Sequence, residues 1–96
     1  FMEGVQERSG YFTKGLEKLA AKYQTGDSVR GQGFIIGWPV SKLGPEIVEA
    51  CRLKGLLINC VGGKILRFLP PLIVEKQDIN KALTILDEVF AELWKN

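Results

Sequence analysis

The sequence predicts an α+β fold, a two-layer α/β sandwich in which a small antiparallel sheet of about three strands is covered by helices. Apolar residues recur at helical spacing near both ends of the chain, whereas a spacing of two dominates the middle. Two adjacent glycines, Gly62 and Gly63, separate two apolar runs, as in a tight β-hairpin. The expected order of elements is α-β-α-β-β-α, within a single domain spanning residues 1–96.

A long helix is expected at the beginning of the chain, ending at the turn-forming residues 24–28. Its apolar positions follow a roughly helical spacing: Met2, Val5, Phe12, Leu16, Leu19 and Tyr23. Three glycines within this stretch each cost about 1 kcal/mol relative to alanine, so the helix needs packing partners. Because the chain starts inside the helical pattern, we expect it to be a piece of a longer protein.

A strand is expected over residues 29–40, where side chains alternate between two faces. One face carries Phe34, Ile36, Trp38 and Val40, and the other carries Gly33, Ile35 and Gly37. The predicted strand therefore has one crowded and one bare face. A loop at residues 41–44 follows it.

A short second helix is expected next, because Pro45 suits a first helical turn and Gly55 suits a helix end. Its apolar stripe consists of Ile47, Val48 and Cys51. Two strands follow, at residues 56–60 and 65–69, and the turn at residues 61–64 joins them.

The last helix is strongly amphipathic and follows two prolines that end the preceding strand. Its apolar stripe consists of Ile79, Leu83, Leu86, Phe90 and Leu93. Like Phe12 and Tyr23 of the first helix, Phe90 lies on a helical stripe, so these three rings are expected in the core and not in a cofactor cage.

Composition argues against several functional classes. The net charge is +2, with 13 basic and 11 acidic residues interspersed, so no nucleic-acid partner is expected. No apolar run approaches the ~20 residues that span a bilayer, so no membrane partner is expected. The chain has no histidine, which argues against a metal site and against a self-contained Ser/His or Cys/His catalyst. Cys51 and Cys60 are expected to be free thiols, which is typical of a cytoplasmic protein.

Two glycine patterns resemble phosphate-binding motifs, and neither fits. Gly31, Gly33 and Gly37 are spaced one residue too widely for a dinucleotide-binding loop, and they do not open a helix. The segment 62–64, Gly-Gly-Lys, lacks the first glycine of a P-loop and is followed by Ile65 where a hydroxyl residue would bind Mg²⁺. Strand packing and a hairpin turn account for both patterns.

Arg67 is the main candidate for a functional residue, because it lies in the nearly uncharged apolar segment 55–74. Burying an isolated guanidinium is very costly, so Arg67 must pair with a protein carboxylate, reach a cleft or bind an acidic ligand. In the predicted strand it shares a face with Ile65 and Leu69. Asn59 and Lys64 flank the same hairpin, either lining a pocket or serving as a strand-end polar group and a solvated lysine.

Several segments carry a resemblance to a known family. Residues 30–37 read RGQGFIIG, residues 55–59 read GLLIN and residues 66–74 read LRFLPPLIV. With Ile47, Val48 and Cys51 between them, and with Asp78-Ile79 and Ala82-Leu83 in the last helix, they resemble the C-terminal small domain of class III pyridoxal-phosphate-dependent aminotransferases. The resemblance covers essentially the whole chain. Trp38-Pro39-Val40 departs from the family pattern, which bears on the edge of the first strand and not on Arg67.

The resemblance implies the C-terminal domain of a fold-type I transferase, in which Arg67 binds a substrate carboxylate. In such enzymes the Schiff-base lysine and the other groups that bind pyridoxal 5′-phosphate belong to the large domain or the neighbouring subunit. No catalytic or cofactor-binding residue is therefore expected in this chain, and the isolated chain is expected to be inactive.

The resemblance also implies the reaction and the partners. The intact enzyme would transfer an amino group from N-acetylornithine to 2-oxoglutarate in arginine biosynthesis, as a cytoplasmic homodimer whose large domain is part of the same polypeptide. Ornithine or 4-aminobutyrate is an alternative amino donor. A different possibility is a stand-alone regulatory domain that senses an anionic amino acid through Arg67.

Overall fold

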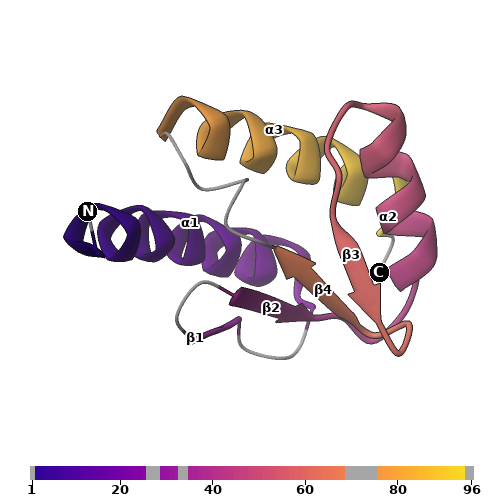
Figure 1. Cartoon of the computed structure of the whole chain (residues 1–96). Coiled ribbons are helices and arrows are strands. Elements are labelled where there is room, and N and C mark those ends of the chain that lie inside the picture. Colours follow the sequence, from indigo (N-terminus) through magenta and orange to yellow (C-terminus); the bar gives the residue numbers. More distant parts are fainter. Residues whose placement is uncertain (1, 26–28, 33–34, 69–75, 95–96) are drawn as a thin grey trace.

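The computed structural model describes residues 2–25, 29–32, 35–68 and 76–94 (Figure 1). Its elements are α1 (Met2–Tyr23), β1 (Arg30–Gln32), β2 (Ile35–Pro39), α2 (Gly44–Leu53), β3 (Asn59–Val61), β4 (Ile65–Phe68) and α3 (Lys76–Leu93). The predicted α+β class is confirmed, as are all three helices. None of the helices in these ranges combines the length and the apolar character that crossing a bilayer requires.

Within the described residues the sheet is antiparallel and has four strands in the order β1-β2-β4-β3. The prediction of a single strand over residues 29–40 was wrong, because β1 and β2 pair with each other in antiparallel fashion. Both arms of a hairpin share the spacing of two, so an alternating pattern does not reveal where the chain reverses. The observed order is therefore α-β-β-α-β-β-α.

The helices form one layer over one face of the sheet (Figure 1). α1 packs on β1 and β2, α2 packs on β3 and β4, and α3 contacts both other helices. From the sheet, this layer buries Ile36 and Trp38 of β2 and Leu66 and Phe68 of β4. The apolar stripe predicted for the last helix is confirmed at its centre, since Leu86 is fully buried.

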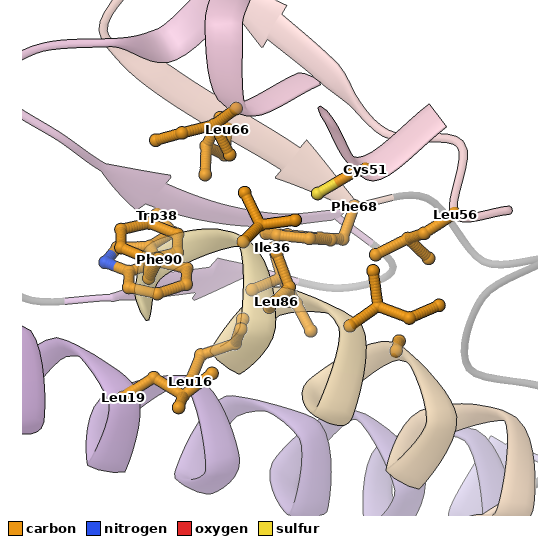
Figure 2. Close-up of a cluster of buried hydrophobic side chains, with 14 of the residues drawn as sticks. Leu16, Leu19, Ile36, Trp38, Cys51, Leu56, Leu66, Phe68, Leu86 and Phe90 are labelled. Carbon is orange, nitrogen blue, oxygen red and sulfur yellow. The ribbon is translucent and has the colours of Figure 1, made fainter. Parts of the chain in front are cut away.

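Aromatic rings join the two layers (Figure 2). Phe90 of α3 stacks on Trp38 of β2 with ring centroids 4.6 Å apart, and Phe12 of α1 meets Phe68 of β4 edge-on at 5.1 Å. Tyr23 packs beside Phe90, with centroids 5.6 Å apart. The prediction that Phe12, Tyr23 and Phe90 are core residues is confirmed for Phe12 and Phe90, which are fully buried, whereas Tyr23 is half-buried and packs against the core.

The end of α2 determines where the next strand can begin. The N–H of Gly55 donates to the carbonyl of Arg52, and the N–H of Leu56 donates to the carbonyl of Cys51, with Gly55 at a φ of 93°. These two bonds form a Schellman motif. Because this motif uses the N–H of Leu56, Leu56 belongs to the end of the helix. β3 begins at Asn59, so the prediction of a strand over residues 56–60 was wrong in its bounds.

The β3–β4 hairpin turns at Gly62 and Gly63, whose φ angles of 62° and 73° lie in the left-handed region, as predicted. The N–H of Val40 donates to the carbonyl of Lys64 at 2.7 Å, which ties the turn to the end of β2. Gly44, the first residue of α2, lies so close that a Cβ there would be 2.8 Å from the carbonyl carbon of Gly63. The hairpin is therefore held from two sides.

Candidate functional site

The candidate site lies on the sheet face turned away from the helices, which we call the outer face. Because side chains alternate along a strand, the residues between the buried ones occupy this face. The described outer-face residues of β2, β4 and β3 are Gly37, Pro39, Ile65, Arg67, Asn59 and Val61. Arg67 shares the face with Ile65, as predicted, while Leu69 lies outside the described residues.

Arg67 lies in the middle of the sheet, where its Cα is in register with Gly37 on one side and Asn59 on the other. Its neighbours in the chain, Leu66 and Phe68, are 0% and 1% exposed on the core side, which fixes the backbone that carries it. Arg67 itself is partly buried. The strand therefore presents the guanidinium from a rigid position on the open side of the fold.

No carboxylate in the described ranges pairs with Arg67. The ion pairs among these residues join Lys22 to Asp87, Arg52 to Glu49 and Lys54 to Glu92. None of the hydrogen bonds between described residues involves the Arg67 side chain either. Within the described part of the chain, the donors of Arg67 are thus available to a ligand or to another part of the protein.

The two other candidate residues, Asn59 and Lys64, lie at different places relative to Arg67. Asn59 is exposed and in register with Arg67, and its Oδ1 accepts a hydrogen bond of 2.9 Å from the N–H of Cys60. Lys64 is exposed in the turn, three residues from Arg67 along the chain, or roughly 10 Å at strand spacing. Asn59 therefore lies directly across from Arg67 on the neighbouring strand, whereas Lys64 lies at the end of the hairpin.

Gly37 is the residue whose position sequence reasoning did not connect with the site. The sequence placed it on a bare strand face, but only the register of β2 with β4 sets it directly beside Arg67. A glycine inside a strand is itself a signal, because such positions often mark a bulge or a close approach by a ligand or another backbone.

The described outer face does not fit pyridoxal phosphate. Its residues of β2, β4 and β3 include neither a lysine for a covalent bond nor a carboxylate for the pyridine nitrogen. We therefore assign no cofactor contact to this face. No group of three metal-ligating side chains occurs among the described residues, where both cysteines are free and burial raises the pKa of the Cys51 thiol to about 11.

A groove of about 550 Å³ lies between α1 and α3, in the helical layer and away from Arg67. It is lined by Tyr11, Lys14, Gly15, Lys18, Leu19, Leu83, Thr84 and Asp87. Asp87 accepts hydrogen bonds from the hydroxyl of Tyr23 and from Nζ of Lys22, and these bonds lower the pKa of its carboxyl. The Asp87 carboxylate, the acidic group of this groove, therefore links α3 to α1 through these hydrogen bonds.

The sequence matches known proteins along nearly its whole length. The model of the family "Aminotransferase class-III" matches residues 1–90. The acetylornithine aminotransferase of Methanocaldococcus jannaschii is 47% identical over 91 residues, which cover 95% of this chain and 23% of that protein. The acetylornithine aminotransferase of Caldanaerobacter subterraneus subsp. tengcongensis is 45% identical over 94 residues, which cover 97% of this chain and 24% of that protein. The chain thus spans about a quarter of the length of these relatives.

The fold agrees with a solved structure from the same group of enzymes. The crystal structure of N-acetylornithine aminotransferase from Stenotrophomonas maltophilia K279a matches 94% of this chain, and 26% of that chain, with a TM-score of 0.84 and 24% identity. The family match, the close relatives and the shared fold lead to one conclusion: this chain belongs to the class III aminotransferases.

Proposed function

We propose that residues 1–96 form the C-terminal small domain of an aminotransferase that uses N-acetylornithine and 2-oxoglutarate in arginine biosynthesis. The support for this substrate pair is that the relatives at 45% and 47% identity are named acetylornithine aminotransferases. In this proposal the groups that bind pyridoxal 5′-phosphate belong to a large domain of the same polypeptide, and the support for a longer polypeptide is that the chain spans about a quarter of these relatives' length. The enzyme is further proposed to be a cytoplasmic homodimer.

In this proposal Arg67 binds the carboxylate of the amino-acid or 2-oxo-acid substrate. The observation that supports this role is the position of Arg67 on the outer face, in register with Gly37 and without a carboxylate partner in the described ranges. A planar guanidinium grips a carboxylate with two parallel hydrogen bonds, which an ammonium group cannot reproduce. Bound pyridoxal phosphate would supply the electron sink, and Arg67 would orient the substrate toward it.

The site suits this role because orientation depends on a rigid support. β4 is an inner strand of the sheet, hydrogen-bonded on both sides, and its core-facing residues are buried. A side chain on such a strand is held more firmly than one on a loop. The hairpin is also held at its turn by Val40 and Gly44.

The test is Arg67→Lys in the full-length enzyme, with Arg52→Lys as the matched control. Arg52 is an exposed arginine of α2 that pairs with Glu49 on the same helix, so its replacement should leave catalysis unchanged. Arg67→Lys keeps the charge and loses the two-pronged geometry, so kcat/KM should fall about ten- to a thousandfold, at ~1.4 kcal/mol per decade. Absorbance of the bound cofactor should stay at its wild-type value.

Melting curves on the same samples separate a substrate role from a structural one. If Arg67→Lys lowers the melting temperature while kcat/KM stays at the wild-type value, Arg67 serves an internal contact and the proposed role is wrong. Assays with N-acetylornithine, ornithine and 4-aminobutyrate as donors test the substrate. A higher kcat/KM for either of the last two would contradict the proposed donor.

A further inference from the structure

We propose that Gly37 determines which ligands fit beside Arg67, by leaving a gap on the outer face that takes one carboxylate group. This inference rests on the proposed function, since it assumes that Arg67 binds a substrate carboxylate. It adds a second residue and a steric rule to that site. Residues larger than glycine at position 37 would fill the gap.

The backbone at Gly37 does not explain why this residue is a glycine. Among the described glycines, those with left-handed φ angles are Gly55, Gly62 and Gly63, and Gly37 is not one of them. A glycine inside a strand also weakens it, because it packs no side chain and loses more freedom on folding than other residues. The missing side chain is therefore the feature that needs a reason.

A side chain at position 37 could project only onto the outer face. Its neighbours in β2, Ile36 and Trp38, are both fully buried on the core side, which fixes the strand's orientation. Directly opposed residues of paired strands have Cβ atoms about 4.5–5.5 Å apart. Methyl groups at position 37 would therefore lie next to the stem of Arg67, in the space where an anion bound by its guanidinium would approach.

The charges across the sheet indicate what occupies this gap. Cross-strand register sets Arg30, Gly37, Arg67 and Asn59 in one row through all four strands. Among the residues of this row whose side chains the structure describes, Arg67 is the charged one and none is acidic, so an anionic ligand is favoured over a cationic one. A carboxylate fits such a place because it is small, planar and accepts two hydrogen bonds.

The experiment measures binding of glutarate, an unreactive dicarboxylate, to the full-length enzyme loaded with its cofactor. Calorimetry compares wild type with Gly37→Ala, Gly37→Val and Arg67→Gln. Gly10→Ala is the matched control, because a Cβ at that exposed helical glycine meets no atom within 4 Å. We expect Gly37→Val to raise the Kd of glutarate at least about tenfold and Gly37→Ala to raise it less. The melting temperature should be unchanged or higher, since valine favours strands.

A Gly37→Val enzyme that binds glutarate within twofold of wild type would overturn the inference. If Gly37→Val gives that result while Arg67→Gln binds glutarate much more weakly than wild type, only the inference about Gly37 fails and the proposed role of Arg67 stands. If Arg67→Gln binds normally, both fail. Where Gly37→Val also lowers the melting temperature, Gly37→Ala decides. If Gly37→Ala raises the Kd of glutarate at an unchanged melting temperature, the result supports the gap. If Gly37→Ala raises the Kd and also lowers the melting temperature, another part of the protein packs on Gly37 and the inference is wrong.

Discussion

Replacing Gly44 with alanine should loosen the hairpin that carries the candidate site. Gly44 begins α2 directly against the β3–β4 turn, and an added Cβ would lie 2.6 Å from Sγ of Cys60 and 2.8 Å from the carbonyl carbon of Gly63. Ordinary van der Waals contacts are 3.4–4 Å. Because one of these neighbours is backbone in a tight turn, the hairpin itself must move to admit the methyl group.

The size of the effect follows from two opposing terms. Overpacking at a tight site costs about 1–3 kcal/mol, and the gain in helix propensity from glycine to alanine is at most about 1 kcal/mol. We therefore expect a net loss of about 1–2 kcal/mol. For a domain of this length that corresponds to a fall of roughly 5–15 °C in melting temperature.

The assay is thermal unfolding followed by circular dichroism at the helical band, with Gly10→Ala as the matched variant. Gly10 is a helical glycine whose Cβ would meet no atom within 4 Å, so the same substitution there should stabilise by about 0.5–1 kcal/mol. The two variants should thus shift the melting temperature in opposite directions. If Gly44→Ala melts at or above wild type while Gly10→Ala behaves as expected, the close packing of α2 on the hairpin is refuted.

Three further predictions concern the helical layer. Leu86→Ala at a fully buried position should cost about 2–5 kcal/mol, whereas Leu53→Ala at a position 72% exposed should change stability by less than about 0.5 kcal/mol. Equal urea midpoints for the two variants would show that α3 is peripheral. Hydrogen bonding from Tyr23 lowers the pKa of Asp87, so this carboxylate stabilises the fold above about pH 4 and loses its effect as the pH falls through the lowered pKa. Asp87→Asn should flatten the acid limb of a plot of melting temperature against pH. The same bond raises the pKa of Tyr23, so its contribution is complete below about pH 10 and lost above the raised pKa, and Tyr23→Phe should flatten the alkaline limb. Limbs of unchanged slope would contradict both expectations.

The sequence was sufficient where a local signal identified one structure. The amphipathic stripe of α3 and the paired glycines at positions 62 and 63 each predicted an element that the structure confirms. The sequence also predicted that Arg67 shares a face with Ile65, which the structure confirms, because side chains two residues apart on a strand lie on the same face.

The errors occurred where tertiary pairing decides the structure. β1 has only three residues, too few to show a period of its own, so its reversal into β2 was not visible in the sequence. Leu56 looked like a strand residue, yet its N–H closes the end of α2. The relation between Gly37 and Arg67 depends on the register of two strands separated by a helix, which no local pattern encodes.

The placement of the two tryptophans has a consequence for how this domain can be observed. Both Trp38 and Trp94 are buried against the same ring, that of Phe90, at centroid distances of 4.6 Å and 5.5 Å. Since these are the only tryptophans in the chain, its intrinsic fluorescence originates from a single location in the core. Emission should therefore respond strongly when α3 separates from the sheet, and hardly at all when an anion reaches Arg67 on the opposite face. A fluorophore for that event has to be introduced on the outer face, and Val61, 43% exposed on the edge strand, is a suitable position for it.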